Sequence, residues 1–229
     1  MITKIIATIG PASFDYKTLK GMRDAGMSIA RINTKYAPIS DVARLKVMTD
    51  KLGCKLLVDI NNLSVINDLK LIDFDYLALA FTQSASQIKM VKSLFGKKIF
   101  LISKIEDKKG VSNVNSITRA TDGLMVARGD LGGNVPLAKL PVIQKLLIKK
   151  CNAAGKFVIT ATEMLLSMVS SKTPEKAEVS DVANAVLDGS DALMLSEETA
   201  IGKHPIIVVK LMSGVIREAE KFKNKLKNH

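Results

Sequence analysis

Eight short runs of apolar, mostly β-branched residues are spread along the 229-residue chain. They lie at residues 4–10, 28–33, 55–60, 76–81, 99–105, 123–129, 157–161 and 192–196. Between them, apolar positions recur with the period of a helix, most clearly at 14–26, 40–53, 85–96, 114–120, 140–155, 178–189 and 205–227. The connection at residues 66–75 is the shortest and least regular. Eight strands alternating with helices predict an α/β protein whose single domain, residues 1–229, is a (β/α)8 barrel.

Polar side chains follow almost every one of these apolar runs. In residues 99–107, IFLISKIED, side-chain alternation puts Lys104 and Glu106 on the same face as Phe100 and Ile102, at the carboxyl end of the strand. The other strand ends carry Gly10, Arg31, Asn33, Asp59, Phe81, Arg128, Gly129, Asp130, Thr160, Thr162, Ser196, Glu197 and Glu198. A capped loop would explain any one of these ends. Because all of them meet on one rim of a barrel, their convergence favours an active site there.

Two carboxylates and two cations dominate the chemistry of this rim. Glu106 and Asp130 lie at the tips of adjacent strands, and carboxylate oxygens are preferred ligands of Mg²⁺ and Mn²⁺. Lys104 and Arg31 add positive charge. The segment RGDLGGNVP, residues 128–136, is typical of a tight turn into a short helix, whose free backbone N–H groups can bind a carboxylate or phosphate. This combination suits a small polyanion, in phosphoryl transfer or in stabilising an enolate.

Composition narrows the classes of partner. The formal charge of +12 favours anionic partners, but aromatic residues make up only 4% of the chain and the basic residues are scattered, so nucleic acid is not favoured. Two cysteines and two histidines provide neither a disulfide framework nor a Cys/His zinc cluster. Because no apolar run is long enough to span a bilayer and the first residues do not resemble a signal peptide, we expect a cytoplasmic protein without a membrane partner.

Longer motifs carry a more specific signal. The chain contains, in this order, TKIIATIGPAS, AGMSIARIN, ISKIED, DGLMVARGDLG, IQKLLIKKCNAAGK, VITATEML and AEVSDVANAVLDGSDALMLSEETAIGKHP. This series closely resembles the catalytic barrel of the pyruvate kinase family. Members of that family transfer a phosphoryl group from phosphoenolpyruvate to ADP, and the resulting enolate is protonated to pyruvate. The resemblance therefore implies these two small molecules as substrates.

The resemblance also implies a role for each matching residue. Lys104 matches the family's catalytic lysine and Arg31 its phosphate-contacting arginine. Glu106 and Asp130 match the ligands of the divalent metal, Mg²⁺ or Mn²⁺. The positions that bind the substrate carboxylate correspond to Gly129, Asp130 and Thr162. The expected catalytic group is accordingly Lys104, Arg31 and Thr162.

The chain departs from the family pattern on its nucleotide side. After the third strand it reads DINNLSVI where the family usually has D-T-K-G-P-E-I-R and an inserted lid domain, so we expect the lid to be absent, and likewise the C-terminal regulatory domain. Tyr36 stands where a nucleotide-contacting histidine usually lies. Lys35 and Ile60 replace hydroxyl residues that help bind a potassium ion, whereas Asn33 and Asp59 remain. We expect the Lys35 ammonium to lie beside Asp59 as the remnant of that site, so that potassium is not required.

Two classes of function remain open. The first is a minimal pyruvate kinase-like phosphotransferase. The lysine, metal and oxyacid positions support it. The second is a relative that no longer phosphorylates ADP, because an open site weakens every electrostatic contact and replacements also occur at Gly133, Asn134 and Glu197. Such a relative is either a metal-dependent enzyme that enolises or decarboxylates 2-oxoacids, or a non-enzymatic binding protein. Either class allows an oligomer.

Overall fold

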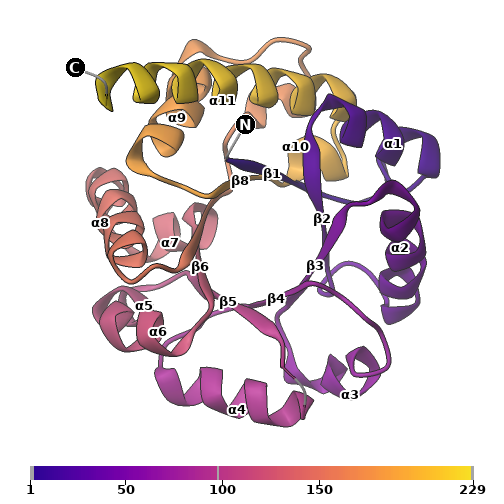
Figure 1. The fold of residues 1–229 in the computed structure, drawn as a ribbon, viewed down its shortest axis with the longest axis vertical. Helices are drawn as coiled ribbons and strands as arrows, with labels where there is room; N and C mark the ends of the chain where they lie inside the picture. The colour runs from indigo at the N-terminus through magenta and orange to yellow at the C-terminus, as the bar shows by residue number, and fades with distance from the viewer. Residues whose placement is uncertain (1–2, 97, 228–229) are drawn as a thin grey trace.

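The computed structural model describes residues 3–96 and 98–227 and shows a closed barrel of parallel strands surrounded by helices (Figure 1). Each strand pairs with the next along the chain, and β8 closes the barrel by pairing with β1. The strands are β1 Lys4–Thr8, β2 Met27–Asn33, β3 Lys55–Ile60, β4 Tyr76–Leu79, β5 Phe100–Ile105, β6 Gly123–Ala127, β7 Phe157–Ala161 and β8 Ala192–Leu195. The predicted (β/α)8 barrel is confirmed.

Seven longer helices cover the outside of the barrel within the described residues (Figure 1). They are α1 Tyr16–Ala25, α2 Ile39–Leu52, α4 Ala85–Phe95, α6 Val114–Ala120, α8 Leu140–Ala153, α9 Lys176–Asp188 and α11 Pro205–Lys227. Short segments lie in the connections: η1 Leu63–Val65, α3 Ile66–Leu69, α5 Lys108–Ser112, α7 Arg128–Asn134, η2 Leu137–Lys139, η3 Leu166–Val169 and α10 Glu197–Ala200. Gly53 and Gly189 end α2 and α9 in the left-handed conformation, as expected for helix C-caps.

Three strands end two residues earlier than their apolar runs predict. The runs at 4–10, 76–81 and 123–129 give strands that stop at Thr8, Leu79 and Ala127. In the second case Phe81 has a positive φ of 46°, which no strand residue adopts, and in the third α7 begins directly at Arg128. The chain therefore turns away from the sheet at these points, and the polar residues that follow belong to the rim.

The core has two layers, one between the strands and the helices and one inside the barrel. The inner layer is formed by Ile6, Ile29, Leu57, Ala78, Ile102, Met125, Ala127, Ile159, Ala161, Ala192 and Met194. Because both faces of every strand are buried, the strands read as continuous apolar runs without polar alternation. Met164 and Met168, just beyond β7, are also fully buried in the outer layer.

The two ends of the barrel differ in chemistry. Tyr76, Phe100 and Phe157 are the first residues of their strands and therefore lie at the amino end. The ring of Phe100 meets the other two edge to face, with centroids 5.2 Å from Tyr76 and 6.2 Å from Phe157. Such edge-to-face contacts are favourable aromatic geometry. The charged residues predicted from the sequence lie at the opposite, carboxyl end.

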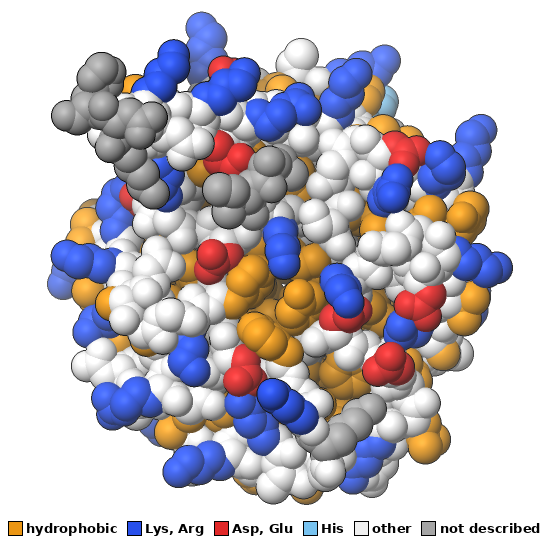
Figure 2. Space-filling model, viewed as in Figure 1, with side chains coloured by type: hydrophobic (Ala, Val, Ile, Leu, Met, Phe, Trp, Pro, Cys, Tyr) orange, Lys and Arg blue, Asp and Glu red, His pale blue; other side chains and the backbone are white. Residues whose placement is uncertain are grey.

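The connection from β3 to β4 consists of residues 61–75, which contain only η1 and α3. No further domain is inserted in this described stretch. On the face seen in Figure 2, Lys and Arg side chains are spread around the molecule among fewer acidic ones. No helix in the described ranges combines the length and the apolar character that a membrane span requires.

Candidate active site

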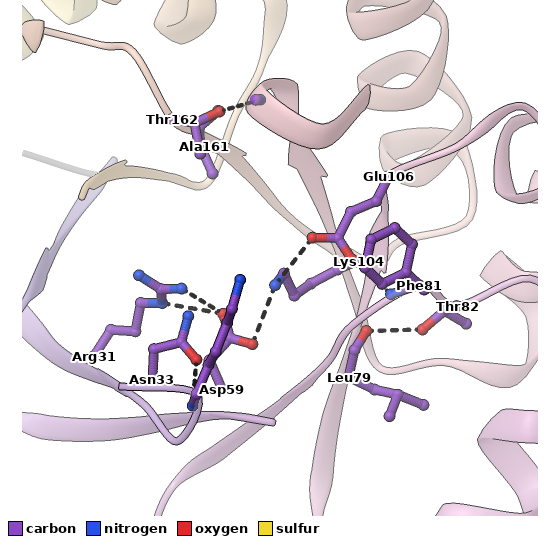
Figure 3. A network of polar contacts seen from close by, with 12 residues as sticks. Arg31, Asn33, Asp59, Leu79, Phe81, Thr82, Lys104, Glu106, Ala161 and Thr162 are labelled. Carbon is purple, nitrogen blue, oxygen red and sulfur yellow. Dashed lines mark hydrogen bonds and ion pairs between the residues drawn. The ribbon is translucent and has the colours of Figure 1, made fainter. Parts of the chain in front are cut away.

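A buried ionic network lies at the carboxyl end of β2, β3 and β5 (Figure 3). The guanidinium of Arg31 donates to Oδ2 of Asp59 through Nε at 3.1 Å and Nη2 at 2.7 Å. The ammonium of Lys104 lies between two carboxylates, 3.2 Å from Oδ1 of Asp59 and 3.0 Å from Oε1 of Glu106. Nη1 of Arg31 also donates to the hydroxyl of Thr8. Four strands or strand ends thus hold one cluster of charges.

Strand geometry explains why these side chains meet. Ile102 belongs to the inner layer of the barrel, so Lys104, two residues further along β5, also points inward and reaches the rim. Glu106 follows at the next inward position. Asp59 pairs in register with Asn33 of β2 on one side and Ala78 of β4 on the other. The stagger of the barrel brings its carboxylate between the two cations.

Burial and charge shift the two carboxylates in opposite directions. Burial by itself raises the pKa of Asp59, which has no exposed surface, but Arg31 and Lys104 together hold that pKa below its ordinary value. Burial raises the pKa of Glu106, and the nearby Lys104 and the N–H of Phe81 only partly offset it. The surroundings therefore favour the charged form of Asp59 and disfavour that of Glu106.

Thr162 and Gly129 are in direct contact beside this cluster. The N–H of Gly129, in the first turn of α7, donates to Oγ1 of Thr162 at 2.7 Å, and that hydroxyl donates to the backbone oxygen of Ala161. Thr162 follows β7 with a φ of +69°, an uncommon conformation for a β-branched residue. The Gly129 N–H, expected from the sequence to be free, is therefore engaged by Thr162 in the structure.

A cavity of about 670 Å³ opens next to Arg31. Apolar groups including Ile9, Pro11 and Phe14 line it, together with Tyr36, Asn33, Ser196 and Glu197. Oγ of Ser196 is buried and has no hydrogen-bond partner among the described residues. Glu197 is exposed, as the first residue of α10. The cavity thus combines an apolar wall with one unsatisfied hydroxyl, the cation of Arg31 and the two acidic residues Asp41 and Glu197.

The structure corrects the expected position of Lys35. Its side chain is exposed and its Nζ lies 5.2 Å from the ring centroid of Tyr36, a cation–π contact. The carboxylate of Asp59 is paired with Arg31 and Lys104 instead. Arg31 and Lys104 are more deeply buried than Lys35, so they, and not a loop lysine, supply the positive charge next to Asp59.

Comparison with known families identifies this arrangement. The family model for the pyruvate kinase barrel domain matches residues 52–209, which is more than half of the chain. The chain belongs to the pyruvate kinase family. Pyruvate kinase from Thermococcus litoralis is 48% identical over 168 residues, covering 69% of this chain and 35% of that protein. For pyruvate kinase from Dictyostelium discoideum the identity is 51%, over 64% of this chain and 29% of that protein.

A plant relative has a similar identity and coverage. The cytosolic isozyme of pyruvate kinase from Solanum tuberosum is 50% identical over 151 residues, or 65% of this chain and 30% of that protein. These matches span about a third of the length of the relatives. Membership of the pyruvate kinase family therefore rests on the barrel.

Asn134 connects the backbones of the two residues, Glu106 and Asp130, that the pyruvate kinase resemblance assigns to a divalent metal. The side-chain amide of Asn134 donates to the backbone oxygens of Glu106 at 3.1 Å and Asp130 at 2.9 Å. Glu106 is buried and Asp130 is exposed. Residues 3–96 and 98–227 contain no cluster of three or more His, Cys, Asp or Glu that would hold a metal unaided. Oε1 and Oε2 of Glu106 are engaged by Lys104 and by the N–H of Phe81, and carboxylate oxygens of this kind are the ligands that hard cations prefer.

Several residues that organise this pyruvate kinase-type site were missed by sequence reasoning. Arg128 was noted only as a strand-end cation, yet its guanidinium binds the chain after β7. The N–H of Phe81 donates to Oε2 of Glu106 at 2.6 Å. Glu198, fully buried, accepts the N–H groups of Leu165 and Ser196, which joins the loops after β7 and β8. Thr160 has a structural place, since its hydroxyl pairs with that of Ser190. None of these pairings has a signal in sequence spacing.

Proposed function

We propose that this barrel is a divalent metal-dependent phosphotransferase that converts phosphoenolpyruvate and ADP into pyruvate and ATP. The observation that carries the proposal is the buried position of Lys104 between Asp59 and Glu106, with Arg31 on the other side of Asp59. Two cations and two carboxylates meet at the barrel mouth, and a bound divalent metal would add the positive charge that an anionic substrate needs. A small anion that develops further charge on oxygen during reaction is the substrate that such a site favours.

We assign a separate role in the proposed reaction to each group of site residues. Arg31 and Lys104 bind the phosphoryl group and the bridging oxygen and stabilise the charge that develops on the enolate. Thr162, Gly129 and Asp130 are the proposed contacts of the substrate carboxylate, which would replace Thr162 Oγ1 as the acceptor of the Gly129 N–H. Glu106 and Asp130 would hold Mg²⁺ or Mn²⁺, which supplies Lewis-acid stabilisation of the substrate oxygens. The proton for the enolate would come from Lys104, Thr162, Ser196 or water.

One observation favours a second candidate, an enzyme that enolises 2-oxoacids without phosphorylating ADP. The cavity beside Arg31, which is the available space for a nucleotide, carries the Glu197 carboxylate and Tyr36 at its wall. A carboxylate opposes the binding of a diphosphate. In addition, residues 61–75 are too few to form a lid that keeps water from the phosphoryl group. Both features weaken phosphoryl transfer and leave oxyacid chemistry untouched.

Two assays on the same protein separate these candidates. A coupled assay with phosphoenolpyruvate, ADP and Mg²⁺ or Mn²⁺ measures phosphoryl transfer, and NMR in deuterated water measures exchange of the methyl protons of pyruvate. We expect both activities, and we expect Glu106→Gln to abolish both by removing a ligand charge. Exchange without ATP formation would support the enolising enzyme. If neither activity is found, or if exchange persists undiminished with the metal chelated, the proposed site is wrong.

The proposed substrates are small molecules, so we propose no membrane or nucleic-acid partner. The relatives from Solanum tuberosum and Glycine max are named cytosolic isozymes, which supports a cytoplasmic location for this chain. Fractionation of cells that express the untagged protein at its natural level tests that location.

A further inference from the structure

One buried arginine outside the ionic cluster directs two of its three nitrogens to the loop that carries Thr162. Arg128 is 8% exposed, and its Nε and Nη2 groups donate to the backbone oxygens of three consecutive residues. The contacts are Nε to Ala161 at 3.3 Å, Nε and Nη2 to Thr162 at 3.2 and 2.5 Å, and Nη2 to Glu163 at 3.2 Å. A guanidinium offers five donors in a fixed plane, and three successive carbonyls are a matching set of acceptors.

The other side of the same guanidinium is anchored on the outer helices. Nη1 of Arg128 donates to Oδ2 of Asp181 in α9 at 2.5 Å and to Oε1 of Gln144 in α8 at 3.3 Å. Gln144 is buried, and the side chain of Asp181 is one-third exposed. The arginine therefore connects the helical layer to the loop after β7, and its orientation is fixed from both directions.

The loop that it holds has an unfavourable backbone. Thr162 and Glu163 have φ values of +69° and +53°, and neither is glycine. Consecutive left-handed residues persist only when the surrounding contacts determine them. The hydroxyl of Thr162 accepts the Gly129 N–H in this conformation, so the backbone angle decides where the hydroxyl lies.

We propose that Arg128 is a positioning residue, which holds Thr162 and Glu163 in the left-handed conformation and so presents Thr162 to the carboxylate of the substrate. The role in turnover rests on the proposed function, whereas the conformational role does not. Asp181 and Gln144 orient the guanidinium. Lysine cannot replace Arg128, because one ammonium group cannot reach three carbonyls and two helix side chains together.

The first test reads the conformation directly and needs no activity. The amide and methyl resonances of Thr162, and its HN–Hα coupling, are recorded by NMR in the unliganded protein. We expect Arg128→Lys to shift these resonances and to change the coupling, and Asp181→Asn to do so less. Arg119→Lys, a change at an exposed arginine of α6, serves as the matched control and should leave them in place. Unchanged Thr162 parameters in a folded Arg128→Lys protein would overturn the proposal.

The second test links the conformation to substrate binding. We expect Arg128→Lys to raise KM for phosphoenolpyruvate about tenfold while KM for ADP stays constant, because Thr162 contacts only the oxyacid. Adding Glu163→Gly, which removes one of the two left-handed non-glycine residues, should recover part of that loss. An equal rise in both KM values, or no recovery in the double variant, would contradict positioning through Thr162. If the wild-type protein has no phosphotransfer activity, the proposed function fails while the NMR test still decides the conformational role.

Discussion

The Nζ atom of Lys104 lies 3.2 Å from Oδ1 of Asp59, a carboxylate with no exposed surface. Because Arg31 binds Oδ2 of the same group, two cations share one fixed anion. Lys104 is therefore held in place before any ligand arrives, by a partner that does not need to move. Its ammonium is thereby fixed at the barrel mouth, where we expect an anionic substrate to bind.

Replacing that lysine should separate folding from catalysis. We expect Lys104→Met to reduce phosphotransfer or enolisation by about 10²-fold or more, since it removes the charge opposite the developing oxyanion. It should also raise the pKa of Glu106 further, because Lys104 lowers that pKa in the wild type. The coupled assay measures the first effect and ¹³C NMR of the labelled carboxylate the second. Wild-type activity in the variant would place the catalytic cation elsewhere.

Asp59 should control stability in acid. Its folded-state pKa lies below the ordinary value of 3.8, so its contribution to the free energy of unfolding is complete above that pH and is lost as pH falls further. Asp59→Asn leaves Arg31 without its anion and Lys104 with Glu106 alone, and should destabilise the protein by about 3–5 kcal/mol at pH 7. Urea titrations from pH 7 to pH 2 should show this difference shrinking below pH 4. A constant difference over that range would contradict the lowered pKa.

Metal binding should depend on an exposed carboxylate. Asp130 lies in the first turn of α7 with its side chain at the surface, so Asp130→Asn should keep the unfolding free energy of the wild type. The affinity for Mn²⁺, measured by calorimetry with pyruvate present, should fall by about tenfold or more. Asp68→Asn, which changes another exposed carboxylate, is the control. Equal Mn²⁺ affinity in all three proteins would exclude Asp130 as a ligand.

We expect activity to be independent of potassium. The side-chain oxygens of Asp59 are occupied by Arg31 and Lys104, and its backbone oxygen accepts the N–H and hydroxyl of Thr34. Oδ1 of Asn33 accepts the N–H of Lys35. Few oxygens therefore remain for a monovalent ion. The Lys35→Ser variant should be independent of potassium as well. A several-fold rise in rate with potassium chloride, but not with a tetraalkylammonium salt of equal ionic strength, would show the expectation to be wrong.

The Glu197 carboxylate should weaken nucleotide binding. Two unit charges about 4 Å apart in water repel by roughly 1 kcal/mol, so Glu197→Gln should lower KM for ADP by about fivefold. KM for phosphoenolpyruvate should not change. Glu163→Gln, an exposed acid outside the cavity beside Arg31, provides the comparison. The same effect from both variants would indicate long-range charge and not a contact in that cavity.

The strand pattern was readable from the sequence because burial on both faces makes each strand an apolar run. Side-chain alternation placed Lys104 and Glu106 on one side of the chain, and the structure shows their side chains in contact at the carboxyl end of β5. The residues at which strands end were predicted less accurately. An apolar residue such as Phe81 continues the pattern of a strand, although its backbone has already turned away.

The partners within the site could not be read from the sequence. Asp59 meets Lys104 only because β3, β4 and β5 are staggered around a closed barrel, and residue spacing does not encode that stagger. Arg128 is the first residue of α7, and its contacts with the chain after β7 join positions more than thirty residues apart. For Lys35 the sequence suggested a partner, Asp59, that the structure does not give it. Its long flexible side chain has several possible partners, and it lies over the ring of Tyr36.

The aromatic contact among Tyr76, Phe100 and Phe157 lies at the far end of the barrel from every residue proposed for catalysis. Changes in these rings alter how firmly the strands are joined and leave the charges at the other rim untouched. The molecule can therefore be stabilised or weakened by engineering one end while its chemistry is redesigned at the other. A barrel of this kind is a modular scaffold in which durability and reactivity evolve separately.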